Sequence, residues 1–143
     1  MYFSITDNKL NGSLPTELGS LTSLTFLGVS KTQIFRTIPT EFGKLEQLIT
    51  LSAFDNKLTG HLPSELGSLT SLTFLGLSGN RLTGTIPTEI GNLTQLSQFL
   101  ADKNHLSGTL STEIGYLTNL ESFLLDDNHI SGAIPTQIGR AHV

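Results

Sequence analysis

Two repeated carboxylates are the strongest candidates for chemistry in this sequence. Asp102 and Asp126 are 24 residues apart, and Asp127 directly follows the second of them. If each residue ends a strand of one parallel sheet, the two carboxylates lie about 5 Å apart. Such a pair could do acid and base work on a carbohydrate, or hold a cation. Because no third ligand accompanies them and Lys103 is adjacent, we expect solvated charges instead.

Two histidines repeat with the same spacing. His105 and His129 occupy equivalent positions of neighbouring repeats, so they could approach one metal ion. Two side chains are too few for a zinc site, and we expect no metal. The other residues of this column are Lys9, Gln33, Lys57 and Arg81. The column therefore predicts a polar edge with a positive bias.

Composition narrows the function further. The 143 residues suffice for one domain, and 8 Lys and Arg against 12 Asp and Glu give a net charge of −4, which argues against nucleic-acid binding. The sequence has no cysteine, no Gly-x-Ser-x-Gly motif and no phosphate-binding glycine loop. No stretch approaches 18 consecutive apolar residues, and the first residues do not form a signal peptide. We expect no enzyme activity, no cofactor and no membrane contact by this segment.

A period of 24 residues organises the chain. Asparagine recurs at Asn8, Asn56, Asn80, Asn104 and Asn128. Glycine recurs at Gly12, Gly60, Gly84, Gly108 and Gly132. Thr32 and Arg36 are the exceptions to these two columns, and both fall in the second repeat. A repeat of this length is typical of a solenoid.

Each repeat contains the elements of one coil. Leu75 and Leu77 alternate at period two, which predicts a short strand with one buried face. Six such strands must stack in parallel to bury that face, and parallel connections are right-handed. The Pro-Thr-Glu-Leu-Gly segment predicts a 3₁₀ turn that begins at proline and stops at glycine. We therefore predict an α/β solenoid over residues 1–137, a right-handed superhelix with a curved parallel sheet on its concave face and short 3₁₀ turns on its convex face.

The unit from Leu69 to Gly91 has the pattern Leu-x-x-Leu-x-x-Leu-x-Leu-x-x-Asn-x-Leu-x-Gly-x-Ile-Pro-x-x-Ile-Gly. This pattern resembles the leucine-rich repeat, in the variant typical of plant receptor ectodomains, and the resemblance covers residues 2 to about 139. The resemblance implies a non-catalytic module that binds a protein or peptide. It also implies an extracellular or cell-surface location as part of a receptor-like protein or receptor-like kinase.

The asparagine column is expected inside the coils. A short amide can bond the backbone where the chain turns away from a strand, so the stacked asparagines predict a hydrogen-bonded ladder. Thr32 and Arg36 lack the asparagine amide and the glycine flexibility of their columns. We therefore expect a local distortion of the backbone in the second repeat.

Outward-pointing side chains of the strands define the candidate binding surface. Phe26, Phe54 and Phe74 lie beside small residues, which predicts an apolar hollow with aromatic walls, and exposed aromatic residues tend to mark contact surfaces. The alternative is that the rings only cover neighbouring strands. The predicted ligand-binding residues are Tyr2, Phe26, Lys31, Phe54, Phe74, Leu100, Asp102, Lys103, Leu124, Asp126 and Asp127.

A column of hydroxyl side chains gives an alternative function. Regular hydroxyls on a rigid surface could match an ice lattice, whereas threonine after proline also suits a helical turn. A structural or ice-binding repeat therefore stays open. The hydroxyl column comprises Thr16, Thr40, Ser64, Thr88, Thr112 and Thr136.

Asn11 and Asn92 match the N-glycosylation pattern.

The two ends carry separate expectations. Neither end has a cap, so the exposed ends of the core could associate with other chains. The leucine pattern stops after Gly139. Residues 138–143 are what ATC-GGA-AGA-GCA-CAC-GTC encodes, a sequencing-library adapter translated in frame. We interpret these residues as a non-native tail on a fragment of a longer gene product.

Overall fold

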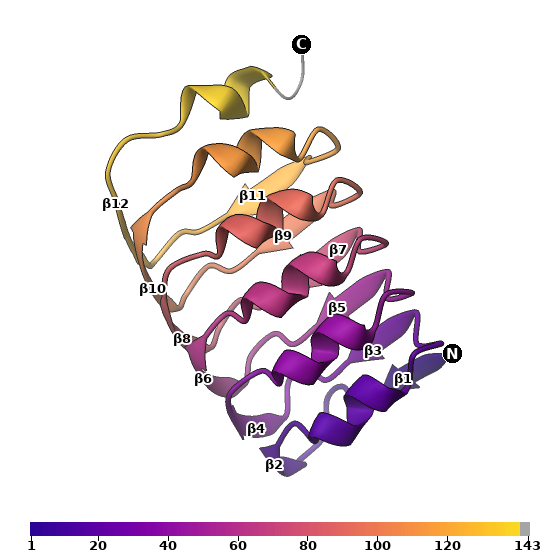
Figure 1. Ribbon diagram of the computed structural model, residues 1–143. Helices are drawn as coiled ribbons and strands as arrows, with labels where there is room; N and C mark the ends of the chain where they lie inside the picture. Colours follow the sequence, from indigo (N-terminus) through magenta and orange to yellow (C-terminus); the bar gives the residue numbers. More distant parts are fainter. Residues whose placement is uncertain (141–143) are drawn as a thin grey trace.

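The computed structural model describes residues 1–140 as a solenoid of stacked coils (Figure 1). A six-stranded parallel sheet forms the concave side, and each residue pairs with its equivalent one repeat later, as Tyr2 does with Phe26. The predicted solenoid with a parallel sheet is confirmed. The strands of this first sheet are β1 (Tyr2–Ser4), β3 (Phe26–Gly28), β5 (Thr50–Ser52), β7 (Phe74–Gly76), β9 (Gln98–Leu100) and β11 (Ser122–Leu124).

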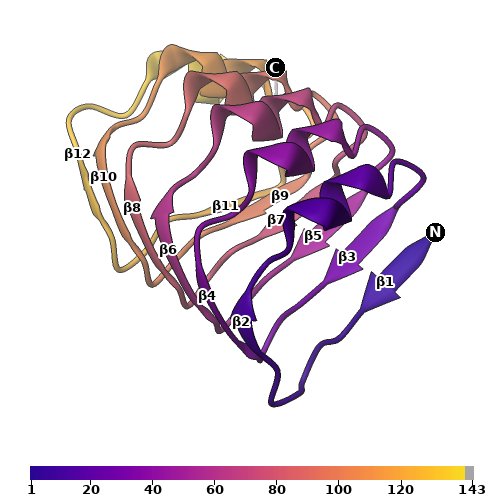
Figure 2. The same cartoon turned by 60° about the horizontal axis from the view of Figure 1, so that its bottom comes forward.

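A second parallel sheet, which was not among the predicted elements, runs along one lateral side of the solenoid. Figure 2 shows it between the first sheet and the helices. Its register is offset, because Asn11 pairs with Gln33 only 22 residues later. The strands of this second sheet are β2 (Asn11–Ser13), β4 (Gln33–Arg36), β6 (Lys57–His61), β8 (Arg81–Gly84), β10 (His105–Thr109) and β12 (His129–Ser131).

Short 3₁₀ helices close each coil on the convex side, as predicted. The prediction that glycine stops each helix was wrong, because the glycine lies inside the helix. A Cβ atom at Gly67 would lie 2.5 Å from the Glu89 carbonyl oxygen of the next helix, so glycine allows neighbouring helices to approach closely. Among residues 1–140 no helix is long and apolar enough to cross a membrane. The helices are η1 (Thr16–Ser20), η2 (Thr40–Lys44), η3 (Ser64–Ser68), η4 (Thr88–Asn92), η5 (Thr112–Tyr116) and η6 (Thr136–Arg140).

One continuous leucine-rich core fills the inside of the coils. Leu72, Leu75 and Leu77 of one coil are completely buried, and their equivalents in the neighbouring coils pack against them. A single coil exposes this apolar face on both sides, so each coil depends on its neighbours for burial.

Asparagines join each coil to the preceding one. The Asn80 side-chain amide donates to the carbonyl oxygens of Ala53, at 2.8 Å, and of Leu77, at 2.9 Å. Its Oδ1 accepts the Leu58 N–H at 3.0 Å. The side-chain amide of Asn8, in the first coil, donates only within its own coil. The same set of bonds as for Asn80 is made by Asn56, Asn104 and Asn128.

The backbone of the second repeat is regular, so the predicted distortion was wrong. The Thr32 hydroxyl donates to Asn56 Oδ1 at 2.6 Å and lies 3.1 Å from the Val29 carbonyl oxygen, so it keeps part of the column's hydrogen bonding. Arg36 adopts a φ of 68°, close to the 76° of Gly60. The strand β4 still pairs with both neighbours.

A smaller neighbour makes room for the Arg36 side chain. A Cβ atom at Gly60 would lie 2.7 Å from the methyl carbon of Thr37 in the preceding coil. The residue at the corresponding position before Arg36 is Ser13, which has no methyl group. Arg36 therefore bears only the cost of a left-handed conformation, about 1–2 kcal/mol for a residue with a Cβ atom.

Candidate ligand-binding site

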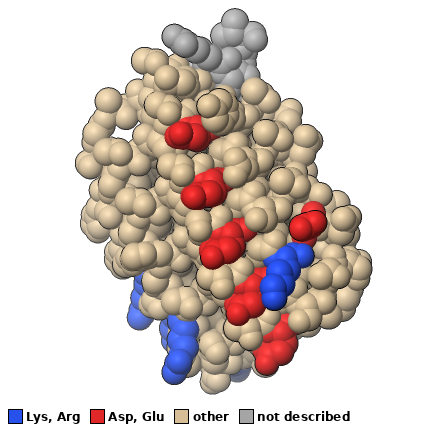
Figure 3. Space-filling view, in the orientation of Figure 1, with Lys and Arg blue, Asp and Glu red and all other residues tan. Residues whose placement is uncertain are grey.

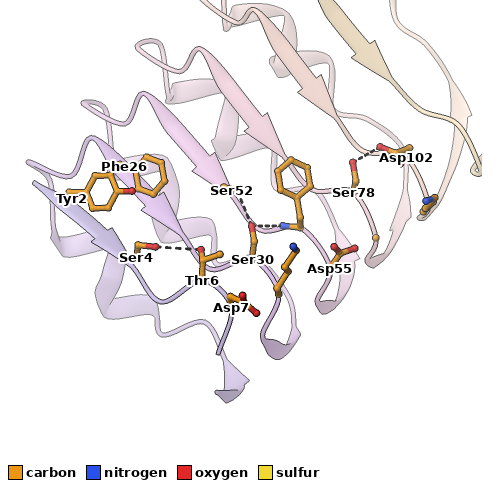
Figure 4. Close-up of a pocket in the computed structure, with 14 residues that line it drawn as sticks. Tyr2, Ser4, Thr6, Asp7, Phe26, Ser30, Ser52, Asp55, Ser78 and Asp102 are labelled. Carbon is orange, nitrogen blue, oxygen red and sulfur yellow. Dashed lines mark hydrogen bonds between the residues drawn. The ribbon is translucent and has the colours of Figure 1, made fainter. Parts of the chain in front are cut away.

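The concave face carries a hollow of about 600 Å³, here called the concave hollow (Figure 4). It extends over five neighbouring coils, from β1 to the segment that follows β9. Six of the predicted ligand-binding residues line it, namely Tyr2, Phe26, Lys31, Phe54, Asp102 and Lys103.

Aromatic side chains form two walls of the concave hollow. Tyr2 and Phe26 stack with ring centroids 4.0 Å apart and planes 7° apart. Phe54 meets Phe74 edge to face at 5.8 Å. A Cβ atom at Gly76 would lie 2.7 Å from Phe74 Cε1, so glycine lets this ring lie against the sheet. The apolar ring faces can therefore receive apolar side chains of a ligand.

Hydroxyl groups line the space between these walls. The Ser30 Oγ accepts the Phe54 N–H at 3.0 Å and lies 2.8 Å from the Ser52 Oγ. The Ser78 hydroxyl donates to Asp102. These bonds run between neighbouring coils and fix the orientation of the hydroxyls, which leaves polar groups in place for a ligand.

Charged residues form the rim of the concave hollow where the chain leaves each strand. Asp7, Lys31, Asp55 and Lys103 all have a positive φ, between 52° and 59°. This conformation turns the chain sharply and projects their exposed side chains beside the hollow. Because the sign alternates from Asp7 to Lys31 to Asp55, the rim offers partners for both charges of a peptide.

Five predicted residues lie outside the lining of the concave hollow. Phe74 supports Phe54 from the side, whereas Leu100, Leu124, Asp126 and Asp127 lie on or after the strands β9 and β11, towards the last coil. Asp7, Asp55 and the serines were not among the predicted residues, although they fall in the same outward columns. Their position in these outward columns is the sequence feature that could have identified them. The lining residues that were not selected are Ser4, Thr6, Asp7, Ser30, Ser52, Asp55, Ser78 and Gly79.

The repeated histidines lie on the second sheet, whereas the repeated aspartates follow strands of the first sheet. His105 and His129 stack with ring centroids 6.0 Å apart, on the second sheet. Asp102 and Asp126 follow neighbouring strands of the first sheet, and Asp102 accepts the Ser78 hydroxyl. Over residues 1–140, no three His, Asp or Glu side chains gather as a metal-binding group.

The hydroxyl column lies on the convex helices, where five of its six side chains bond the glutamate that follows and Thr136 bonds Gln137. The Thr88 hydroxyl donates to Glu89 Oε2 at 3.3 Å, and Thr112 bonds Glu113 in the same way. Figure 3 shows the glutamates as a row of acidic groups across this face. Hydrogen bonds from its own backbone N–H and from Ser111 lower the pKa of Glu113 below its usual value. The ice-binding alternative would have to use hydroxyls beside this charged row.

Asn11 and Asn92, the two glycosylation candidates, are exposed, at the start of β2 and at the end of η4. Their modification stays a prediction. Residues 141–143 of the predicted tail lie outside the described residues, and the origin of the tail likewise stays a prediction.

The coils and their repeat define a plant-type leucine-rich-repeat solenoid. A family model described as a leucine-rich repeat region matches residues 2–99, and a leucine-rich repeat model matches residues 119–141. The chain therefore belongs to the leucine-rich-repeat family. A search of curated protein sequences found no match.

Solved structures of plant receptors are similar to this chain. The plant peptide hormone receptor RGFR1 in complex with RGF2 is 38% identical, with 92% of this chain and 21% of that chain covered and a TM-score of 0.90. The PEPR1–AtPEP1 structure is 37% identical, with 98% and 20% covered and a TM-score of 0.95. The Arabidopsis receptor kinase HAESA, in complex with the peptide hormone IDA and the co-receptor SERK1, is 34% identical, with 96% and 23% covered and a TM-score of 0.93. This chain spans about a fifth of the length of these receptor chains.

Proposed function

We propose that this chain is a non-catalytic recognition module that binds a peptide or an extended protein segment in the concave hollow. The observation that carries the proposal is the convergence of aromatic walls, fixed hydroxyls and charges of both signs on one hollow. A volume of about 600 Å³ falls within the usual range of ligand sites, roughly 300–1,000 Å³.

The dimensions of the concave hollow fit an extended peptide. Five parallel strands span about 19 Å, which equals the length of five to six extended residues. The alternate side chains of such a peptide could contact the ring of Phe26 or Phe54, while its charged groups face Lys31 or Asp55. Peptide complexes among the similar receptors support this class of ligand.

We further propose that the chain is one part of a longer receptor-like protein at the cell surface. The similar receptor chains are about five times as long, and this chain matches only a part of each. Determining the complete open reading frame tests this part of the proposal. A reading frame that ends at the last coil, with no signal peptide or membrane span, would contradict it.

Selection from a random dodecapeptide library tests the binding site. Peptides that bind the wild-type chain should lose at least tenfold in affinity when Phe26 and Phe74 are both changed to Ser, because each aromatic pair then loses one ring. Phe26 lines the hollow itself, and Phe74 supports Phe54. The matched control is Tyr116→Ser, which removes an aromatic ring that is 64% exposed on the convex helix η5. Selected peptides that bind Phe26→Ser/Phe74→Ser as tightly as the wild type would contradict the proposal, provided that circular dichroism shows the variant folded.

A further inference from the structure

The outward side of the second sheet, here called the lateral face, has a charge opposite to that of the whole chain. Arg36, Lys57 and Arg81 lie on its strands, and Lys9 lies two residues before β2. Within the described strands of this sheet there is no aspartate or glutamate. The acidic residues in view in Figure 3 lie over the helices, away from the basic groups at the lower left edge. A chain of net charge −4 thus carries a separate cationic surface.

A hollow of about 520 Å³ lies on the lateral face between β2 and β8. Arg36, Lys57 and Arg81 line it together with Phe35, whose side chain is 41% exposed. The Arg36 guanidinium carbon lies 6.0 Å from the centroid of the Phe35 ring. This hollow therefore combines three cations with one accessible aromatic surface.

The aspartates that precede these strands belong to the concave side. Asp55 comes two residues before Lys57, but it lines the concave hollow, and its carboxylate lies over the backbone of Gly79 in the next coil. The lateral face and the concave hollow are thus electrostatically distinct surfaces on either side of this turn. A ligand on one surface need not contact the other.

We propose that the lateral hollow binds an acidic segment of a partner polypeptide. The three strand spacings from β2 to β8 span about 15 Å, the length of four to five extended residues. Carboxylates of such a segment pair with Lys57 and Arg81, and an arginine can bind a carboxylate through two parallel hydrogen bonds. An apolar side chain of the segment packs on Phe35.

The arrangement favours a peptide over a repeating anionic polysaccharide. The cations do not recur on every strand, since Gln33 stands between Lys9 and Lys57 in the column. An exposed phenyl ring also matches an apolar side chain better than it matches a chain of uronic acids. An acidic peptide with one central apolar residue therefore complements the charge and the ring together.

Fluorescence anisotropy with a labelled Glu-Glu-Leu-Glu-Glu peptide tests the proposal at low salt. We expect the double variant Lys57→Glu/Arg81→Glu to weaken binding about tenfold or more, because two attractions become repulsions. The matched control is Lys44→Glu, which reverses an exposed charge on the convex helix η2 and should change the affinity less than twofold. The neutral peptide Gln-Gln-Leu-Gln-Gln should bind at least tenfold more weakly than the acidic one.

Further variants and ligands separate the lateral hollow from the concave hollow and a peptide from a polysaccharide. Phe35→Ser should weaken the leucine-containing peptide about threefold and leave Glu-Glu-Gly-Glu-Glu unchanged. Phe26→Ser/Phe74→Ser, which tests the concave hollow, should leave acidic-peptide binding unchanged, so the two sites can fail separately. Equal losses for Lys44→Glu and Lys57→Glu/Arg81→Glu would overturn the proposal. Polygalacturonate that binds more tightly than the peptide, and that loses affinity in Lys57→Glu/Arg81→Glu, would overturn the choice of a polypeptide.

Discussion

Replacing Asn80 by Ala should destabilise the solenoid strongly, because this side chain serves the backbone of two coils. Its exposed fraction is 7%, and it satisfies the Leu58 N–H and shares in satisfying the carbonyls of Ala53 and Leu77. After the substitution, Leu77 keeps a bond from the Asn104 amide at 3.0 Å, and Ala53 keeps a longer one from the Asn56 amide at 3.4 Å.

The magnitude follows from these remaining bonds. The Leu58 N–H loses its acceptor, Asn80 Oδ1, and a buried unsatisfied group costs about 1–3 kcal/mol. Two weakened carbonyl interactions add about 1 kcal/mol. We expect a loss of about 3 kcal/mol in the free energy of unfolding, or about 10 °C in melting temperature for a domain of this size.

The assay is urea and thermal unfolding followed by circular dichroism, with amide hydrogen exchange at Leu58 as a local measurement. Asn8→Ala is the matched control in the same column, because Asn8 is exposed and its side chain bonds only the carbonyls of Ile5 and Thr6. It should cost less than about 1 kcal/mol. Equal effects of Asn80→Ala and Asn8→Ala, or unchanged exchange at Leu58, would refute the reasoning.

Four further predictions follow from the packing and the surface. Gly67→Ala should cost about 1–3 kcal/mol in thermal unfolding, because its Cβ atom would meet the next helix. Gly60→Ala should cost at least about 1–2 kcal/mol, because alanine must adopt the positive φ of Gly60. Arg36→Gly should change stability by less than about 1 kcal/mol, because the relief of the positive φ is offset by the greater conformational freedom that glycine gives the unfolded chain. When the chain is secreted from eukaryotic cells, treatment with an N-glycosidase should lower its apparent mass, unless Asn11 and Asn92 are both changed to Gln. Nanolitre osmometry should show no thermal hysteresis; a clear hysteresis would favour the ice-binding alternative.

The stacking of coils could be predicted because the same residue types recur at the same positions of each repeat. Leu75, Leu77 and Asn80 recur with one period, and a short strand with a single apolar face needs neighbours on both sides. The second sheet carried no comparable signal. Its strand β2 is Asn-Gly-Ser, and such residues are typical of turns rather than strands, so here the stacking imposes the pairing on the residues.

Two errors concerned residues that act through another coil. Glycine in the helices was interpreted as a stop signal, but its role depends on the backbone of the next helix. Arg36 was expected to distort its repeat, but Ser13 in the preceding coil leaves room for it. Column patterns within one repeat do not show which residue of the next coil lies opposite.

The candidate site was predictable in outline only. Alternation placed Phe26 and Phe54 on the outward side, and both line the concave hollow. The left-handed rim residues and the bonds of Ser30 depend on backbone dihedrals and side-chain rotamers that a single sequence does not specify. The extent of the hollow, which ends before Leu124, depends on the same details.

Amide chemical-shift mapping with a selected dodecapeptide tests the central claim most directly. The Phe54 N–H, which donates to the Ser30 hydroxyl beside the aromatic walls, should shift on titration together with amides of β3, β5 and β7. Amides of the helices η2 to η4 should stay in place. Shifts confined to those helices or to the second sheet, with none at Phe54, would contradict ligand binding in the concave hollow.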